Sequence, residues 1–250
     1  MERIFICGDV HGHFSAFSEH LKKLAQAYPE DMLSVFVCGD FGYWPLDLNM
    51  DKDLIVPDNV VVYFCPGNHE DWESLNKLKL NDAGMREVHP RVWYCSFGST
   101  LTVRDKYFMF LGGAESVDRF YRVPDVSWFK DEGISEEAMS ELLSKKIHRP
   151  IDAVISHTCP DCVRGDTIMV CDRIYPVFAN PDLGNSEEQL ERFNKIHKPK
   201  SWFYGHFHVR NTIKDKDQVF EALGDMYLPK HEWMMEYEDG SLEVQAIDQV

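Results

Sequence analysis

Five short apolar runs in this 250-residue chain each end in residues that commonly bind metal ions. They end in Gly8-Asp9-Val10-His11, Gly39-Asp40, Gly67-Asn68-His69-Glu70, Ser156-His157 and Gly205-His206-Phe207-His208. In an open α/β sheet the carboxyl ends of parallel strands meet at one crevice, so residues far apart in the sequence are gathered there without strain. A glycine before such a residue lets the backbone turn sharply and leaves room beside an ion. The pattern therefore favours an α/β fold with its functional site at the strand ends.

The first half of the chain alternates between apolar runs and helical spacing. Apolar residues recur at helical spacing from Phe14 to Tyr28, which predicts one helix. The β-branched runs before and after it are typical of buried parallel strands, whereas the three runs after Arg91 lie close together and predict an antiparallel meander. The expected strands are residues 3–7, 34–38, 60–65, 92–94, 100–103 and 107–111.

Two later helices have start signals in the sequence. Ser135 is expected to cap a helix that runs to about His148, and Ser186 with Gln189 forms a capping box for another. Further strands are expected at residues 151–156, 202–204, 209–213, 219–223, 232–237 and 242–247, the last after a turn at Asp239-Gly240. We find no internal repeat, linker or low-complexity segment, which predicts a single α/β domain of two packed sheets over residues 1–250.

The charge balance restricts the partners of the chain. With 26 Lys and Arg against 42 Asp and Glu, the formal net charge is −16, so long-range electrostatics repels polyphosphate backbones and argues against general nucleic-acid coating. The sequence begins Met1-Glu2-Arg3 and passes directly into an apolar strand-like run, without a basic segment and a long apolar one. No stretch is long and apolar enough to cross a membrane. These features predict a cytoplasmic protein with no membrane partner.

The seven cysteines are expected to be reduced. Cys7, Cys38 and Cys65 each close an apolar run, where a free thiol behaves as a small buried hydrophobe. Cys159 and Cys162, with Cys171 nearby, have a spacing that could bind zinc, but no second Cys-x-x-Cys completes a tetrahedral site. We interpret that segment as an ordinary loop.

The residue types at the strand ends indicate the class of metal. Asp and His with one Asn suit Mn, Fe, Zn or Ni better than an all-oxygen calcium cage. Seven candidate ligands are too many for one ion. Two ions about 3.5 to 4 Å apart, sharing one carboxylate, would use them all and make a bridging water acidic enough to act as hydroxide. Each residue alone could instead form a turn or a hydrogen-bonded cap.

Taken in order, these segments resemble the five motifs of the calcineurin-like metallophosphoesterases, from residue 8 to residue 208. The resemblance implies a four-layer α/β/β/α sandwich of two mixed sheets flanked by helices, with a dinuclear centre between strand ends. It implies that one ion is held by Asp9, His11 and His208. It implies that the other is held by Asn68, His157 and His206, with Asp40 bridging the two.

The third motif also contains candidates for contact with the substrate. The resemblance implies that His69 reaches the substrate, where it protonates the leaving group or binds phosphate together with Asn68. The alternative is a structural histidine that caps the following helix. Glu70 and Asp71 could orient the ring of His69, or lie in the first turn of that helix, where negative charge is favourable.

One departure from the family narrows the substrate class. Protein phosphatases of this family continue the second motif with an Asp-Arg pair, but Tyr43 and Trp44 stand there, which disfavours a protein phosphatase. Phosphate would then be held by the metals, by backbone donors such as Gly112-Gly113, or by another arginine. The candidates lie in the long segments 112–133 and 158–185, and any of them could be a solvated surface charge: Arg119, Arg122, Arg164 and Arg173. These segments are also rich in aromatic residues, for which we favour packing over base stacking.

The sequence as a whole predicts a metal-dependent phosphoric ester hydrolase. The bridging hydroxide would attack phosphorus in line, and His69 would assist the leaving oxygen. The expected substrate is a phosphodiester or a small phosphorylated metabolite such as a nucleotide, with phosphomonoester hydrolysis as the rival. A non-catalytic scaffold that binds a partner protein would predict eroded ligands. A nuclease within a larger assembly would need a partner to supply affinity for DNA.

Overall fold

Strands β1 (Glu2–Cys7) and β2 (Met32–Val37) are buried on both faces, which fixes the layers of the fold. In β1, Phe5 and Cys7 pack into one hydrophobic cluster, whereas Ile4 and Ile6 pack into another. Because successive side chains of a strand point to opposite faces, a run without polar residues must be covered on both sides. The first cluster lies under helix α1 (Phe14–Ala27), and the second lies between the two sheets.

The computed structural model describes residues 1–44, 50–171 and 185–237. Within these residues there are two six-stranded sheets, with the orders β12-β1-β2-β3-β5-β4 and β10-β11-β9-β8-β7-β6. The remaining strands are β3 (Val60–Phe64), β4 (Met85–His89), β5 (Val92–Cys95), β6 (Ser99–Val103), β7 (Lys106–Leu111), β8 (Ala153–Ser156), β9 (Ser201–Tyr204), β10 (Asn211–Asp215), β11 (Gln218–Ala222) and β12 (Met234–Glu236). In both sheets the four central strands are parallel and the two edge strands are antiparallel to their neighbours.

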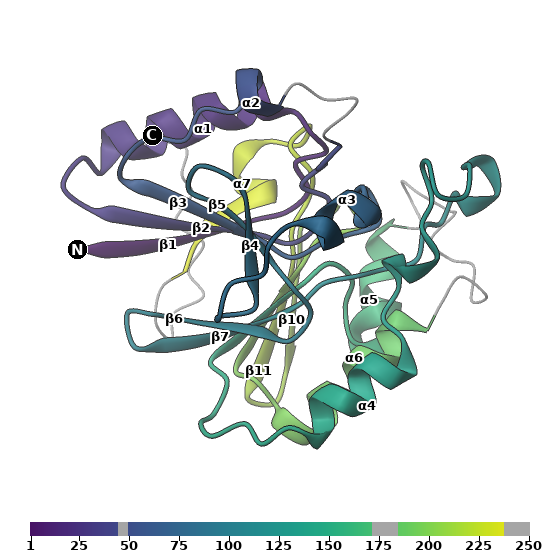
Figure 1. Ribbon diagram of the computed structural model, residues 1–250. Coiled ribbons are helices and arrows are strands. Elements are labelled where there is room, and N and C mark those ends of the chain that lie inside the picture. Colours follow the sequence, from purple (N-terminus) through teal and green to yellow (C-terminus); the bar gives the residue numbers. More distant parts are fainter. Residues whose placement is uncertain (45–49, 172–184, 238–250) are drawn as a thin grey trace.

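Helices cover the outer face of each sheet (Figure 1). Helix α1 and the short α2 (Met50–Asp53) lie over the first sheet, and α4 (Glu136–Ser144), α5 (Asp161–Cys171) and α6 (Ser186–His197) lie over the second. The short helices α3 (Trp72–Lys77) and α7 (Lys230–Trp233) follow β3 and precede β12. The order of layers is helix, sheet, sheet, helix, so the predicted α/β/β/α sandwich of two mixed sheets is confirmed.

The predicted antiparallel meander is wrong. Strand β5 pairs in parallel with β3 in the first sheet, whereas β6 and β7 form a hairpin at the edge of the second. The chain crosses from one sheet to the other between Cys95 and Ser99, through a turn in which Gly98 has a φ of +79°. Turn residues mark where a strand ends, but they do not specify which sheet receives the next one.

The ends of the later helices differ from the prediction. The hydroxyl of Ser135 accepts from the backbone N–H of Ala138, as expected, but helix α4 ends at Ser144. The capping box at Ser186 is not formed, because its hydroxyl accepts from the backbone N–H of Ile134 on another segment. The residue that precedes α6 as its cap is Asn185. The expected strand at 232–237 is divided between α7 and β12.

The interpretation of the segment around Cys159 and Cys162 as a loop is wrong in part, because Cys162 lies in the first turn of helix α5. Its buried positions are Val163, Thr167 and Cys171, spaced four residues apart. A threonine and a cysteine can form such a face when they pack against a neighbouring helix, although they give a weak apolar signal in the sequence. The expected strand 242–247, the turn at Asp239-Gly240 and Arg173 lie outside the described residues.

Candidate metal centre

The predicted ligands lie at the ends of five parallel strands, three from the first sheet and two from the second. Asp9 and His11 follow β1, and Asp40 follows β2. The remaining strand ends carry Asn68 and His69 after β3, His157 after β8, and His206 and His208 after β9. Because the carboxyl ends of these strands converge, the predicted ligands lie close together between the two sheets.

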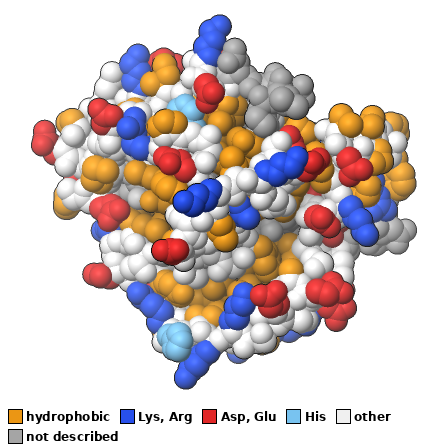
Figure 2. Space-filling model, viewed as in Figure 1, with side chains coloured by type: hydrophobic (Ala, Val, Ile, Leu, Met, Phe, Trp, Pro, Cys, Tyr) orange, Lys and Arg blue, Asp and Glu red, His pale blue; other side chains and the backbone are white. Residues whose placement is uncertain are grey.

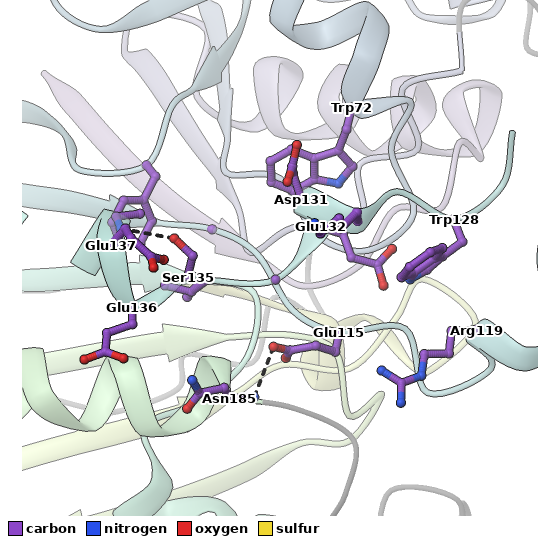
Figure 3. A pocket seen from close by; sticks show the side chains of 16 residues that line it. Trp72, Glu115, Arg119, Trp128, Asp131, Glu132, Ser135, Glu136, Glu137 and Asn185 are labelled. Atoms are coloured by element: carbon purple, nitrogen blue, oxygen red, sulfur yellow. Dashed lines mark hydrogen bonds between the residues drawn. The ribbon is translucent and has the colours of Figure 1, made fainter. Parts of the chain in front are cut away.

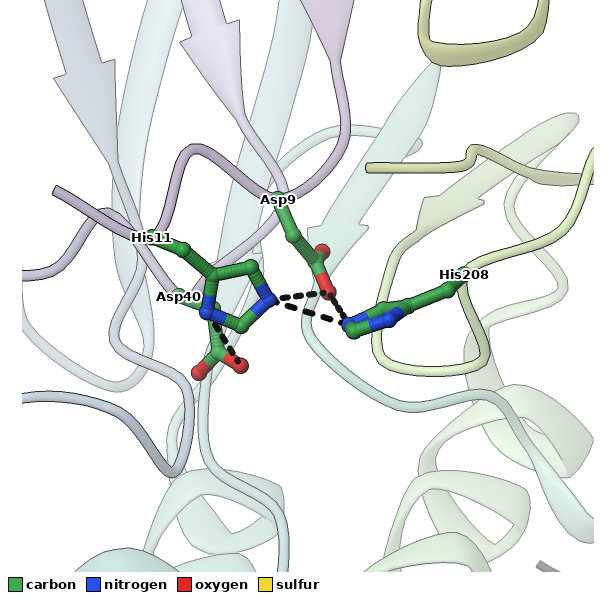
Figure 4. Close-up of side chains that lie close together, drawn as sticks. All are labelled: Asp9, His11, Asp40 and His208. Carbon is green, nitrogen blue, oxygen red and sulfur yellow. Dashed lines mark hydrogen bonds and ion pairs between the residues drawn. The ribbon is translucent and has the colours of Figure 1, made fainter. Parts of the chain in front are cut away.

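Four of the predicted ligands form one compact group (Figure 4). Ligand atoms of Asp9, His11, Asp40 and His208 lie within 4.8 Å of one another, and no other such group of His, Cys, Asp or Glu occurs in the described parts of the chain. The Nε2 atom of His208 is 3.0 Å from Asp9 Oδ2 and 3.0 Å from His11 Nε2. Two imidazole nitrogens and a carboxylate oxygen that face one another form a donor set suited to a transition-metal ion.

The other three predicted ligands surround this group. His157 Nε2 is 3.2 Å from Asp40 Oδ1 and 3.0 Å from Asn68 Oδ1, and its Nδ1 is 2.8 Å from the carbonyl oxygen of Cys38. A hydrogen bond from Nδ1 to that carbonyl would orient Nε2 toward Asp40. The backbone N–H of His206 donates to Asp9, and its ring lies edge-on to that of His157 with centroids 4.8 Å apart.

The backbone holds several of these residues in a strained conformation. His11, Asp40, His206 and His208 have φ values of 50°, 46°, 67° and 52°. The left-handed region is uncommon for residues other than glycine, and each such residue costs about 1–3 kcal/mol. Such strain clusters at functional sites, so its presence at four predicted ligands is an argument that the loops serve binding.

The charges of the site fit a cation. Asp9 and Asp40 are 0% and 1% exposed, and Asp40 Oδ2 has no hydrogen-bond partner within the described structure. Burial would raise the pKa of Asp40, but His157 and His69 hold it well below its usual value. Burial and the charge of His157 hold the pKa of His206 well below its usual value. A buried carboxylate oxygen without a donor, beside an imidazole held neutral, suits a bound metal ion.

Sequence reasoning missed Asp225, which supports His208. The carboxylate Oδ2 of Asp225 is 3.1 Å from His208 Nδ1, and the residue is buried. A carboxylate behind a ligating histidine fixes the orientation of its ring and raises its basicity. A Gly-Asp pair, Gly224-Asp225, stands shortly after β11 as Gly8-Asp9 stands after β1, but the sequence does not indicate which histidine this aspartate would support.

Glu70 and Asp71 have roles other than orienting the ring of His69. Glu70 accepts backbone N–H bonds from Phe41 at 2.7 Å and Gly67 at 2.7 Å, with a longer one from Gly42. It therefore joins the loop that carries Asp40 to the loop that carries Asn68. Burial raises the pKa of Glu70 to about 8, although these backbone donors oppose the rise. Asp71 caps helix α3 by accepting from the backbone N–H of Ser74.

Among the arginines that the structure describes, Arg122 contacts the third motif. Its Nη2 is 2.6 Å from His69 Nε2, its Nη1 donates to the carbonyl oxygen of Asn68, and its Nε pairs with Asp118 at 2.6 Å. Only 8% of its side chain is exposed, so it is no solvated surface charge. Because the guanidinium can only donate, His69 Nε2 is the acceptor in this contact and the ring is neutral.

The other candidate residues have different positions and contacts. The guanidinium of Arg119 lies over the ring of Phe120 at 5.0 Å, and Arg164 is on helix α5. Trp44 donates through Nε1 to the carbonyl oxygen of His69, so it supports the third motif. Of the aromatic residues after β7, Phe129 is buried, whereas Phe120 and Tyr121 are exposed. Figure 2 shows hydrophobic side chains lying among charged ones on the surface of the molecule. Tyr175 and Phe178 lie outside the described residues.

The seven cysteines are all free thiols. Cys7, Cys38 and Cys65 are buried at strand ends, as expected. Cys159 is buried before helix α5, whereas Cys162 is exposed in its first turn, and neither belongs to a group of metal-ligating side chains in the described structure.

None of the helices described is long and apolar enough to cross a membrane.

Comparisons with known proteins identify the family. No curated protein matches the sequence. Among solved structures, the fold resembles GAP50, the anchor in the inner membrane complex of Plasmodium, with 16% identity over 89% of this chain and 71% of that chain and a TM-score of 0.49. It also resembles phosphopantetheinyl hydrolase from Mycobacterium tuberculosis, with 15% identity, 96% and 99% coverage and a TM-score of 0.48. The family model of the calcineurin-like phosphoesterases matches residues 2–210, and the chain belongs to this family.

Proposed function

We propose that this chain is a metal-dependent phosphoric ester hydrolase with a dinuclear centre. The observation that carries the proposal is the group of Asp9, His11, Asp40 and His208, held in strained loops at the strand ends of a phosphoesterase fold. One ion would be held by Asp9, His11 and His208, and the other by Asn68, His157 and His206. Asp40 stands between the two sets, because its Oδ1 faces His157 and its Oδ2 faces His11.

The donor set of nitrogen and oxygen atoms suits Mn, Fe, Zn or Ni. When bound, such ions supply positive charge against the phosphate oxygens and lower the pKa of a water molecule toward neutrality. The chain contributes fixed geometry. The carboxylate of Asp225 orients the ring of His208, and the carbonyl oxygen of Cys38 orients the ring of His157. The carboxylate of Glu70 connects the loop that carries Asp40 to the loop that carries Asn68.

His69 and Arg122 form the part of the site that would contact the substrate. His69 Nε2 is 4.0 Å from Asp40 Oδ2, so the ring borders the predicted metal position. The guanidinium of Arg122 lies at the same edge, where its Nη2 would bind a phosphate oxygen in place of the arginine that Trp44 replaces. When Arg122 turns from His69 Nε2 to the phosphate, that nitrogen would be free to carry a proton for the leaving oxygen.

Removing the guanidinium of Arg122 should therefore impair catalysis without unfolding the protein. We expect Arg122→Met to lower kcat/KM by about 10- to 100-fold, because a hydrogen bond to a charged group contributes about 1.5–3 kcal/mol. Arg122→Lys should restore the charge but little of the rate, since only a guanidinium reaches His69 and Asn68 together. Steady-state kinetics on a p-nitrophenyl phosphodiester measures both. Arg149→Met, at an exposed arginine beside Asp152, is the matched control, and equal rates in both methionine variants would contradict the assignment.

We infer that the substrate is a phosphodiester or a small phosphorylated metabolite such as a nucleotide. The net charge of −16 opposes binding of a long polyanion, and Trp44 and Tyr43 occupy the places of the protein-phosphatase Asp-Arg pair. Rates on bis-p-nitrophenyl phosphate and p-nitrophenyl phosphate, compared side by side, test this preference. A much faster monoester would make the chain a phosphomonoesterase with the same centre.

Metal analysis combined with hydrolysis tests the proposed function as a whole. Elemental analysis of the purified protein should give about two ions per chain, the stoichiometry of a two-metal site. Activity should disappear on chelation and return with Mn²⁺. Absence of both metal uptake and turnover would instead favour a non-catalytic scaffold. Retention of the isolated protein on DNA at moderate salt would favour the nuclease alternative.

A further inference from the structure

A cavity of about 790 Å³ lies next to the candidate centre, and its lining contains none of the predicted metal ligands. Trp72 on helix α3 forms one side, and the segment from Gly112 to Ala138 forms much of the rest (Figure 3). The indole N–H of Trp72 donates to the carbonyl oxygen of Gly67, the residue before Asn68. A Cβ atom on Gly112 would lie 2.3 Å from Pro66, so this wall packs directly on the turn after β3. The cavity and the centre therefore share one turn of the chain.

One buried carboxylate in the lining has an oxygen without a partner. Glu132 is 2% exposed, and its Oε1 accepts from the backbone N–H of Ser116, whereas its Oε2 has no hydrogen-bond partner within the described structure. Figure 3 shows its carboxylate turned toward Trp128. Burial raises the pKa of Glu132, although Ser116 and Arg122 oppose the rise. Because an unpaired buried acceptor is costly, a donor from a ligand would stabilise this arrangement.

The charge and the aromatic residues of the cavity indicate which kind of ligand would supply this hydrogen-bond donor. Its lining has five carboxylates, Glu115, Asp131, Glu132, Glu136 and Glu137, and two cationic side chains, Arg119 and Lys130. This excess of negative charge disfavours a second phosphate or another anion. Trp72 and Trp128 present indole rings, and indole is the aromatic group that attracts cations most strongly. The volume is that of a pocket for a small organic molecule.

We propose that this cavity binds a protonated alkylamine on the alcohol part of the phosphoester, with Glu132 accepting its N–H and Trp72 and Trp128 beside it. The proposal rests on the proposed function, because the proposed function places the phosphate of the same substrate in the neighbouring metal centre. Binding of the ammonium group itself requires no hydrolysis. The substrate class is thus narrowed to phosphoesters of amino alcohols.

Calorimetry with a matched pair of probes tests binding apart from catalysis. We expect the purified protein to bind 2-phenylethylamine at least about tenfold more tightly than the neutral 2-phenylethanol. This ratio corresponds to the free energy that one hydrogen bond to a charged group contributes. Glu132→Gln should abolish this difference. Glu188→Gln, at an exposed residue on α6 outside the cavity lining, should keep it. Trp128→Leu, at a half-buried position, should also weaken amine binding and replaces Glu132→Gln if that variant does not fold.

Hydrolysis then tests the use of the cavity by the substrate. The p-nitrophenyl phosphodiester of 6-aminohexanol should have a kcat/KM about tenfold above that of hexanol, and Glu132→Gln should bring this ratio near one. Equal affinity for amine and alcohol, or amine binding unchanged by both cavity variants, overturns the proposal. Equal kcat/KM values for the two esters in the unaltered protein also overturn it. Amine binding that depends on Glu132 in a protein that hydrolyses neither ester supports the cavity assignment and overturns the proposed function instead.

Discussion

Replacing Asp40 by asparagine should remove both metal ions and lower phosphoester hydrolysis by about a thousandfold, the several kcal/mol that metal ions contribute to such reactions. Asp40 is the carboxylate between the two predicted ligand sets, with His157 3.2 Å from Oδ1 and His11 3.8 Å from Oδ2. Asparagine keeps the shape and the acceptor for the backbone N–H of His69, which Oδ1 now binds at 2.8 Å. The loss would therefore come from the missing charge. Elemental analysis and p-nitrophenyl phosphodiester kinetics measure it.

The matched control for this variant is Asp58→Asn, at a fully exposed surface carboxylate that pairs with Arg91. It should keep two ions and full activity. Thermal unfolding of both variants establishes that the fold is retained. An Asp40→Asn protein that keeps two ions and its activity would show that Asp40 does not bridge them.

Gly205→Ala should disrupt the centre through a single methyl group. A Cβ atom at this position would lie 1.9 Å from Asp9 Oδ1 and 3.0 Å from the carbonyl oxygen of Cys38. Asp9 must then shift, which changes the contact between its other carboxylate oxygen and His208, now 3.0 Å long. We expect loss of at least one ion, a fall in activity of about a hundredfold or more, and a loss of about 1–3 kcal/mol of stability from overpacking.

Gly165→Ala is the control, because it adds the same methyl group where nothing lies within 4 Å. Since Gly165 is inside helix α5, alanine should raise the free energy of unfolding by about 0.5–1 kcal/mol and leave activity unchanged. Urea unfolding and metal analysis of the two variants provide the comparison. If Gly205→Ala keeps full metal content and activity, the close contact with Asp9 has no functional role.

Much of the fold could be predicted because its signals are local. A short β-branched run that ends in glycine and a polar residue specifies a buried strand and the place where it stops, whatever lies around it. For this reason the strand ends that carry Asp9, Asp40, Asn68 and His157 were evident in the sequence. The meander was not a correct inference, because the turn at Gly98 does not encode the sheet that β6 joins.

Helix α5 and the cap at Asn185 show another limit of local signals. The buried face of α5 contains a threonine and a cysteine, whose burial depends on the neighbouring layer rather than on their own hydrophobicity. The hydroxyl of Ser186 has two competing uses, a helix cap or a bond to the backbone of Ile134, and the packing of α4 and α6 selects the second. The surrounding residues alone determine neither the burial of this helix face nor the hydrogen-bond partner of Ser186.

The sequence by itself determined the family resemblance, the layers and the identity of the predicted ligands, because these depend on short motifs in a fixed order. The tertiary structure alone decided which residues support them. Arg122 contacts His69 across 53 positions of the sequence. Asp225 follows β11, the neighbour of β9 in the second sheet, and from there it contacts His208. Glu70, which could have oriented a ring, instead joins two loops through their backbone. Such contacts depend on how loops from two sheets converge, and no local propensity specifies that convergence.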